Sequence, residues 1–263
     1  MPDCIVERHD RVMLLRFNRP ERMNSMGGTL MPEFTAALEE GTKDDSIGAI
    51  VVTGEGRAWC AGADLEAAGQ RQEQGEAPRR HAQLLDTMGP GRSILAIYKS
   101  GKPMIAAVNG VAVGGGFGLC SAFDIRIASD RARFGTIFIK RALASDFGLS
   151  YFLPRMVGAE SAAELFYTGR IVEAEEALQL GIVSRVVPHD QLIDESLEFA
   201  TQVAKQPPTA LAYARRLLQH SEWATLEQQL ELEWPLQRDL LAGPEFKEAV
   251  AAFREKREPN YNA

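Results

Sequence analysis

Three consecutive glycines, residues 114–116, are the feature of this sequence that most directly suggests chemistry. They follow an apolar run at 104–108 that is typical of a buried strand, and residues 117–122 are typical of a helix. Glycine lets another molecule approach the backbone closely, and the first N–H groups of a helix have no partner within the helix. The segment could therefore hold a phosphate or a developing oxyanion, and glycine-rich packing without function is the alternative. A dinucleotide-binding fingerprint does not fit, because the first strand lies far upstream and no acidic residue ends a following strand in the usual place.

The elements that must position these glycines are short strands mixed with helices. Strands are predicted at 4–8, 12–17, 47–52, 104–108, 125–128 and 184–187, and helices after Thr29 and at 93–98, 161–167 and 174–180. The polar stretch 66–80 is predicted to be a surface loop, followed by a helix at 81–88. From residue 191 onward only helices are predicted, at 191–206, 209–220, 225–241 and 245–255. This order indicates an α/β core over residues 1–190 and a helical C-terminal region over 191–263.

The composition of the chain argues against several classes of partner. The chain has 263 residues with 29 Lys and Arg against 36 Asp and Glu, and its net charge of −7 argues against nucleic-acid and membrane partners. Its three cysteines are widely spaced and suggest neither a disulfide framework nor a zinc site, and the charged N-terminus favours a cytoplasmic protein. Residues 103–123 carry no charge, but five glycines and Asn109 favour a strand, a loop and a buried helix over a membrane span.

Several motifs in chain order resemble the crotonase (enoyl-CoA hydratase/isomerase) superfamily. They are WCAGADL at 59–65, KPMIAAVNGVAVGGG at 102–116 and DIRIAS at 124–129, with support from RPERMNS at 19–25 and AEEALQLGIV at 174–183. The resemblance implies a spiral of ββα units followed by helices that mediate trimerisation, commonly with trimers paired into hexamers. It also implies an acyl-CoA substrate, with coenzyme A as part of that substrate, and no separate cofactor or metal.

The resemblance assigns a thioester oxyanion hole to two backbone N–H groups, those of Ala63 and Gly115. A thioester enolate needs such fixed donors in a dry site. Hydratases of the family also carry two glutamates, and their positions here are Gly118 and Phe138. Hydration needs one group to activate water and another to protonate the α-carbon, and neither residue can do so. A hydratase of the two-glutamate type is therefore not expected.

Asp146 is the candidate that could replace the missing carboxylates. In the family, an aspartate at this place marks several isomerases, and a single carboxylate can remove a proton from one carbon and return it to another. Apolar neighbours such as Phe147 and Leu149 would raise its pKa. The alternative is that Asp146 caps a helix that begins at Phe147. The family's dehalogenase uses this aspartate as a nucleophile with a histidine and a tryptophan, but Gly91 and Phe138 stand in about those places, so that interpretation is rejected.

The other candidate substrate- and CoA-binding residues are Arg22, Ala61, Asp64, Leu65, Gly114, Phe138, Tyr151 and Lys256. Arg22 and Lys256 could meet the CoA phosphates, and Asp64 is expected to hold its loop. Apolar stripes on the last helices are expected to serve as core, as a subunit interface, or as both; they comprise Leu211, Ala214, Leu218, Leu226, Leu230 and Leu232.

Together these features favour an enzyme that shifts the double bond of an unsaturated acyl-CoA through an enolate, with Asp146 as the base. Two alternatives remain open. One is hydratase-type or other enolate chemistry with a non-standard base, and the other is a non-catalytic acyl-CoA-binding protein. A homotrimer or a hexamer is the expected assembly.

Overall fold

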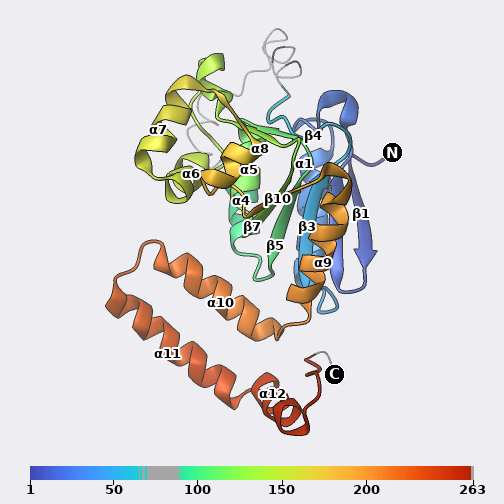
Figure 1. Ribbon diagram of the computed structural model, residues 1–263, viewed down its shortest axis with the longest axis vertical. Helices are drawn as coiled ribbons and strands as arrows, with labels where there is room; N and C mark the ends of the chain where they lie inside the picture. Colours follow the sequence, from blue (N-terminus) through green and yellow to red (C-terminus); the bar gives the residue numbers. More distant parts are fainter. Residues whose placement is uncertain (65, 67–68, 70–88, 90, 262–263) are drawn as a thin grey trace.

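The protein contains a six-stranded sheet that forms the centre of the core (Figure 1). The computed structural model describes residues 1–64, 66, 69, 89 and 91–261. The strands are β1 (Cys4–His9), β2 (Val12–Phe17), β3 (Ala49–Gly54), β5 (Met104–Val108), β7 (Ile125–Ser129) and β10 (Arg185–Val187), hydrogen-bonded in that order. Only β1 and β2 pair antiparallel, and the other neighbours are parallel. Strands β3 and β5 are buried along their whole length, as their apolar runs predict.

A second sheet of four short strands lies beside the first. Its strands are β4 (Ala58–Cys60), β6 (Val111–Val113), β8 (Arg133–Gly135) and β9 (Ile171–Glu173). After β3, β5 and β7 the chain makes a short turn and adds β4, β6 and β8, respectively, to this second sheet. The repeated unit is thus two strands followed by helical structure, which confirms the α/β crotonase fold. None of these four strands was predicted from the sequence.

Helices cover the sheets and continue beyond them. The helices of the core are α1 (Leu30–Lys43), α4 (Gly91–Tyr98), α5 (Gly115–Ser121), α6 (Leu149–Val157), α7 (Ala159–Thr168), α8 (Ala174–Gln179) and α9 (Leu192–Ala204). Short 3₁₀ turns lie at η1 (Pro20–Arg22), η2 (Ile137–Arg141) and η3 (His189–Gln191). Helix α9 packs its buried residues against one face of the six-stranded sheet. The division of the chain at residue 190 stays a prediction.

Most of the predicted elements are present within a residue or two of their expected ends. The loop predicted at 66–80 and the helix predicted at 81–88 lie outside the described residues, apart from Glu66 and Gly69. The uncharged stretch forms β5, β6 and α5, and no helix in the described part of the chain is both long and apolar enough to cross a bilayer. The three cysteines are buried and unpaired, and burial raises the pKa of the Cys60 thiol to about 12.

The last three helices form an arm that stands below the core in Figure 1. They are α10 (Pro208–Ser221), α11 (Leu226–Ala242) and α12 (Pro244–Glu255). Arg215 in α10 joins the arm to the core by an ion pair and a hydrogen bond. Its buried guanidinium lies 2.8 Å from Asp124 and donates to the carbonyl of Ile97 at 3.0 Å. The stripe residues Leu218 and Leu226 are 71% and 75% exposed, so they do not belong to the core of this chain.

Candidate active site

The glycine-rich segment and the loop after β4 are in direct contact. Gly62 has a φ of +83°, and a Cβ atom added there would lie 3.0 Å from the backbone nitrogen of Gly115. A Cβ atom added to Gly116 would collide with the carbonyl oxygen of Cys60. Glycine is therefore required at both positions, because only a backbone without side chains lets the amino end of α5 lie against this loop.

This arrangement leaves two backbone N–H groups available on neighbouring segments. Helix α5 begins at Gly115, and Gly114 precedes it with a φ of +55° while donating to the carbonyl of Gly135 at 2.9 Å. Among the hydrogen bonds between described residues, none uses the N–H of Ala63 or of Gly115. Gly115 is buried, as is all of α5. A free donor at a buried helix start can stabilise a negatively charged oxygen, and the second donor belongs to the exposed Ala63 in the neighbouring loop.

Asp146 lies beside this helix start. Its Oδ1 atom is 3.5 Å from the position that a Cβ atom on Gly115 would occupy. Neighbouring protein atoms displace part of its water, and this raises the pKa of the Asp146 carboxyl above its ordinary value, although the residue stays exposed on one side. A carboxylate with a raised pKa next to free N–H donors is suited to general-base chemistry.

The alternative role of Asp146 as a helix cap is contradicted. Helix α6 begins at Leu149 rather than at Phe147, its N-cap is Gly148 in the left-handed region, and no side chain caps it. The chain reaches the helix through Phe147, which itself has a φ of +49°. A non-glycine residue held in this region is strained, and such strain is found where the surroundings impose the conformation.

Neither position that corresponds to a family glutamate carries a carboxylate, and residues 146 and 147 fill the space beside Gly118. A Cβ atom on Gly118 would lie 2.6 Å from the Cβ of Phe147 and 3.1 Å from the carbonyl oxygens of residues 146 and 147. Phe138, in η2, is 7% exposed, and its ring approaches within 4.0 Å of the Cβ position of Gly114. The space for the first carboxylate is therefore closed by the segment that carries Asp146.

Comparison with known proteins shows the family of the chain. A family model described as enoyl-CoA hydratase/isomerase matches residues 7–263. The chain belongs to the enoyl-CoA hydratase/isomerase (crotonase) superfamily. Membership in the superfamily makes acyl-CoA thioesters the substrate class, whereas the particular reaction depends on the site.

Its superfamily relatives carry different activities in their names. A Mycobacterium tuberculosis protein named probable enoyl-CoA hydratase EchA12 is 39% identical over 97% of this chain and 91% of that protein. The 1,2-epoxyphenylacetyl-CoA isomerase of Escherichia coli is 34% identical over 95% of this chain and 94% of that protein. The crystal structure of an enoyl-CoA hydratase from Polaromonas sp. JS666 matches with a TM-score of 0.91 and 31% identity, covering 98% of this chain and 99% of that one.

Three of the other candidate residues, Ala61, Asp64 and Arg22, form contacts near the loop after β4. Ala61 donates its N–H to the carbonyl of Met23 at 3.0 Å, and the Asp64 carboxylate lies 3.5 Å from the Arg19 guanidinium. Arg22 is exposed and ion-paired with Glu66. Leu65 lies outside the described residues.

Tyr151 contacts the arm of last helices, and Lys256 follows the last of them. The Tyr151 hydroxyl donates to Glu222 at the end of α10 at 2.6 Å, and its ring lies under the Arg155 guanidinium at 3.7 Å. Lys256 follows α12, which lies at the bottom of Figure 1, whereas α5 lies in the core above the arm.

Sequence reasoning missed two features of the site. One is the packing of Phe147, named above only as an apolar neighbour of Asp146, into the space beside both Gly115 and Gly118. The other is the part played by Arg19 and Asn24, which connect the motif at 19–25 to the loop that carries Ala63. The motif at 19–25 signalled that Arg19 and Asn24 matter. Their partners could not be read from it, because they lie in segments far away in the chain.

Proposed function

We propose that this protein isomerises the double bond of an unsaturated acyl-CoA, with Asp146 as the proton-transferring base. In a 3-enoyl-CoA, the Asp146 carboxylate takes a proton from C2, and the electron pair moves onto the thioester oxygen to give a dienolate. The N–H groups of Ala63 and Gly115 stabilise this oxyanion. The protonated Asp146 then returns the proton to C4, and the product is the 2-enoyl-CoA.

The observation that carries the proposal is the position of Asp146 against the helix start. Its Oδ1 is 3.5 Å from the side-chain position of Gly115, so a substrate carbonyl bound at Gly115 would have its α-carbon near this carboxylate. The raised pKa of Asp146 supports the role, because a base whose conjugate acid is less acidic abstracts a carbon-bound proton more readily.

The close packing beside Gly118 and the phenylalanine at position 138 favour isomerisation over hydration. Hydration requires a bound water between two proton-transferring groups, and here Phe147 fills the first position and the Phe138 ring the second. Isomerisation needs neither the water nor the second group. A relative at 34% identity is named as an isomerase of a CoA thioester, which gives the assignment a precedent.

For the CoA part of the substrate we propose contacts on the exposed side of this site. Arg22 would meet the phosphates after exchanging its ion pair with Glu66, while Lys256 could reach a CoA only from a neighbouring subunit. The other residues proposed to bind the substrate are Ala61, Asp64, Leu65, Gly114, Phe138 and Tyr151.

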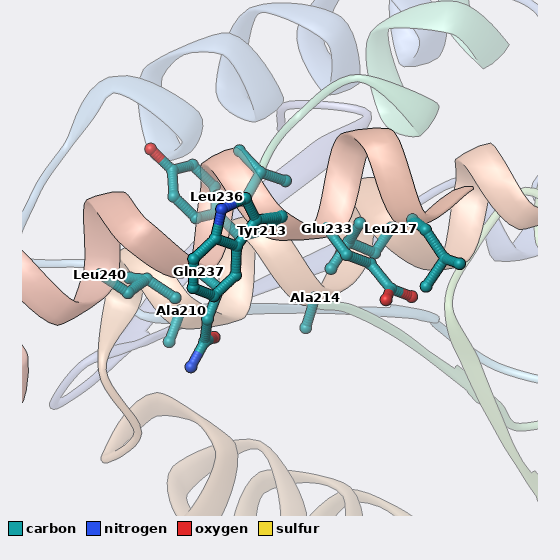
Figure 2. Close-up of a pocket in the computed structure, with 10 residues that line it drawn as sticks. Ala210, Tyr213, Ala214, Leu217, Glu233, Leu236, Gln237 and Leu240 are labelled. Carbon is teal, nitrogen blue, oxygen red and sulfur yellow. The ribbon is translucent and has the colours of Figure 1, made fainter. Parts of the chain in front are cut away.

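A trimer, alone or paired into a hexamer, is the assembly that we propose. A groove of about 590 Å³ lies between α10 and α11, and Figure 2 shows its lining, which includes Tyr213, Leu217 and Leu236. Leu230 and Trp234 on α11 are 54% and 59% exposed. Because monomeric proteins rarely expose so much contiguous apolar surface, these residues are suited to bury one another between chains.

The test is the turnover of 3-hexenoyl-CoA by the unmodified protein and by Asp146→Ala, followed by the absorbance of the conjugated product. We expect turnover by the unmodified protein and a loss in kcat of about 10²–10⁴-fold in the variant, since that is the usual contribution of a general base. Unchanged turnover by the variant would refute the role of Asp146. Hydration of crotonyl-CoA by the unmodified protein would favour a hydratase, and tight acyl-CoA binding without any turnover would favour a non-catalytic binder.

A further inference from the structure

The loop that carries Ala63 is joined to a distant segment of the chain. Met26 donates to the carbonyl of Gly62 at 2.7 Å, and Ala61 donates to the carbonyl of Met23 at 3.0 Å. Met26 and Ala63 form a parallel β-bridge as a result. The direction of the Ala63 N–H is therefore set by the backbone of residues 23–26.

Arg19 lies between these two segments and binds both. Its guanidinium donates to the carbonyl of Ser25 at 2.7 Å and lies 3.5 Å from the carboxylate of Asp64, the residue after Ala63. The Arg19 and Asp64 side chains are 13% and 11% exposed. A Cβ atom on Gly27 would lie 2.8 Å from both side chains, so the pair is closely packed. At this depth the attraction between the charges is only weakly screened by water.

Asn24 holds the same segment from the other side. Its side chain is fully buried, accepts from the backbone N–H of Arg19 at 2.8 Å and donates to the carbonyl of Ala58 in β4 at 2.7 Å. Met23 and Asn24 both have a φ near +54°. The segment thus keeps an unfavourable backbone conformation that its hydrogen bonds impose.

We propose that Arg19 is a positioning residue for the oxyanion hole: through Ser25 and Asp64 it fixes the backbone that aims the Ala63 N–H. This proposal rests on the proposed use of that N–H by the bound thioester. Arg19 does not touch the reacting atoms in this arrangement. Arg19 acts on the angle and distance between the Ala63 N–H and the thioester oxygen. Both must be fixed closely for this donor to stabilise a developing oxyanion.

The first test compares Arg19→Met, Arg19→Lys and Asp64→Asn with the control Arg16→Met. Arg16 is a half-buried arginine in β2 that pairs with Glu7 at 3.0 Å and with Glu55 at 3.7 Å, and no ion pair between described residues joins it to either segment. We expect Arg19→Met to lower kcat for 3-hexenoyl-CoA by about 10–100-fold with little change in KM, which is less than the loss of an entire donor. Arg19→Lys should recover part of this loss, because lysine keeps the charge but cannot reach both partners. The double variant with Asp64→Asn should lose no more than Arg19→Met alone.

The second test does not depend on turnover. Hexanoyl-CoA labelled with ¹³C at the thioester carbonyl is bound to each protein, and the carbonyl stretching frequency is measured by infrared difference spectroscopy. Binding to the unmodified protein, to Arg16→Met and to Asp146→Asn should shift the band to lower frequency, because the oxyanion hole polarises the carbonyl. Arg19→Met should lose much of that shift while retaining its circular dichroism spectrum.

The two proposals can fail separately. If the unmodified protein shifts the carbonyl band but does not turn over 3-hexenoyl-CoA, the isomerase proposal is wrong and the Arg19 variants still report on the oxyanion hole. If a folded Arg19→Met shows the full band shift, the positioning role is wrong whatever the reaction is. If Arg19→Met does not fold, the same comparison is made with Arg19→Lys and Asp64→Asn, and a full band shift in both overturns the proposal.

Discussion

Adding a single methyl group at Gly118 should damage both the stability and the site of this protein. The Cβ atom of Gly118→Ala would lie 2.6 Å from the Cβ of Phe147 and 3.1 Å from two carbonyl oxygens, so backbone rather than a flexible side-chain end must move. Such overpacking costs about 2–3 kcal/mol. Alanine recovers about 1 kcal/mol through its higher helix propensity. The net loss in the free energy of unfolding is then about 1–2 kcal/mol, which lowers the Tm by roughly 2–8 °C.

The matched control is Gly91→Ala. Gly91 begins α4, and beyond its chain neighbours and its own helix backbone no described residue has an atom within 4 Å of the position of its added Cβ. The control should be as stable as the unmodified protein or slightly more stable, and the difference between the two variants, measured by calorimetry, isolates the steric cost. Because the collision displaces the segment that carries Asp146, kcat for 3-hexenoyl-CoA should fall by about 10–100-fold in Gly118→Ala alone.

Gly118→Glu extends the same reasoning to the reaction. Restoring the family glutamate should produce no hydration of crotonyl-CoA, since its side chain has no room beside Phe147. The reasoning would be refuted by a Gly118→Ala protein that matches Gly91→Ala in Tm and keeps full activity. Hydratase activity in a Gly118→Glu protein of unchanged Tm would refute it as well.

Three further outcomes are expected. Because burial raises the pKa of Asp146, the folded protein holds this proton more tightly than the unfolded chain does, and stability falls as the pH rises through the raised pKa. Asp146→Asn should therefore increase the Tm at pH 7, and calorimetry should show the difference shrinking as the pH approaches the ordinary aspartate value of about 4; a lower Tm at pH 7 would contradict this. Arg215→Met leaves Asp124 without its buried partner and should lower the free energy of unfolding by about 2–4 kcal/mol, as measured by urea titration. The control is Arg216→Met, which changes an exposed neighbour and should have little effect. Trp234→Asp should reduce the sedimentation coefficient to that of a smaller assembly, and an unchanged coefficient would exclude α11 from the interface.

Much of the fold could be predicted from local patterns. The apolar runs at 47–52 and 104–108 correspond to β3 and β5, and the long helical patterns after residue 190 correspond to α9–α12. The second sheet could not be predicted, because strands of three residues are too short to show alternation and obtain their hydrogen bonds from segments far away in sequence. The apolar stripes on the arm were also ambiguous, since a core face and an interface face have the same period.

The candidate site was also predicted in part from the sequence and decided in part by tertiary contacts. The resemblance to the crotonase superfamily pointed to the donor segments and to Asp146, and the structure brings Asp146 next to Gly115. The alternative role of Asp146 as a helix cap is wrong, because Phe147 takes a left-handed conformation and α6 begins only at Leu149. Propensity favours a cap at an aspartate, but the contact of Phe147 with Gly118 overrides it.

The sequence by itself determined the family, the order of the main strands and helices, and the loss of both family glutamates. Only the tertiary structure decided what lies at these positions: Phe147 packs against Gly118, the Asp146 carboxylate lies near Gly115, and Arg19 joins residues 23–26 to the loop of Ala63. The physical reason is that residue types and their spacing encode local conformation and burial. The space beside a glycine, and the partner of a buried charge, depend instead on segments that meet only after the chain has folded.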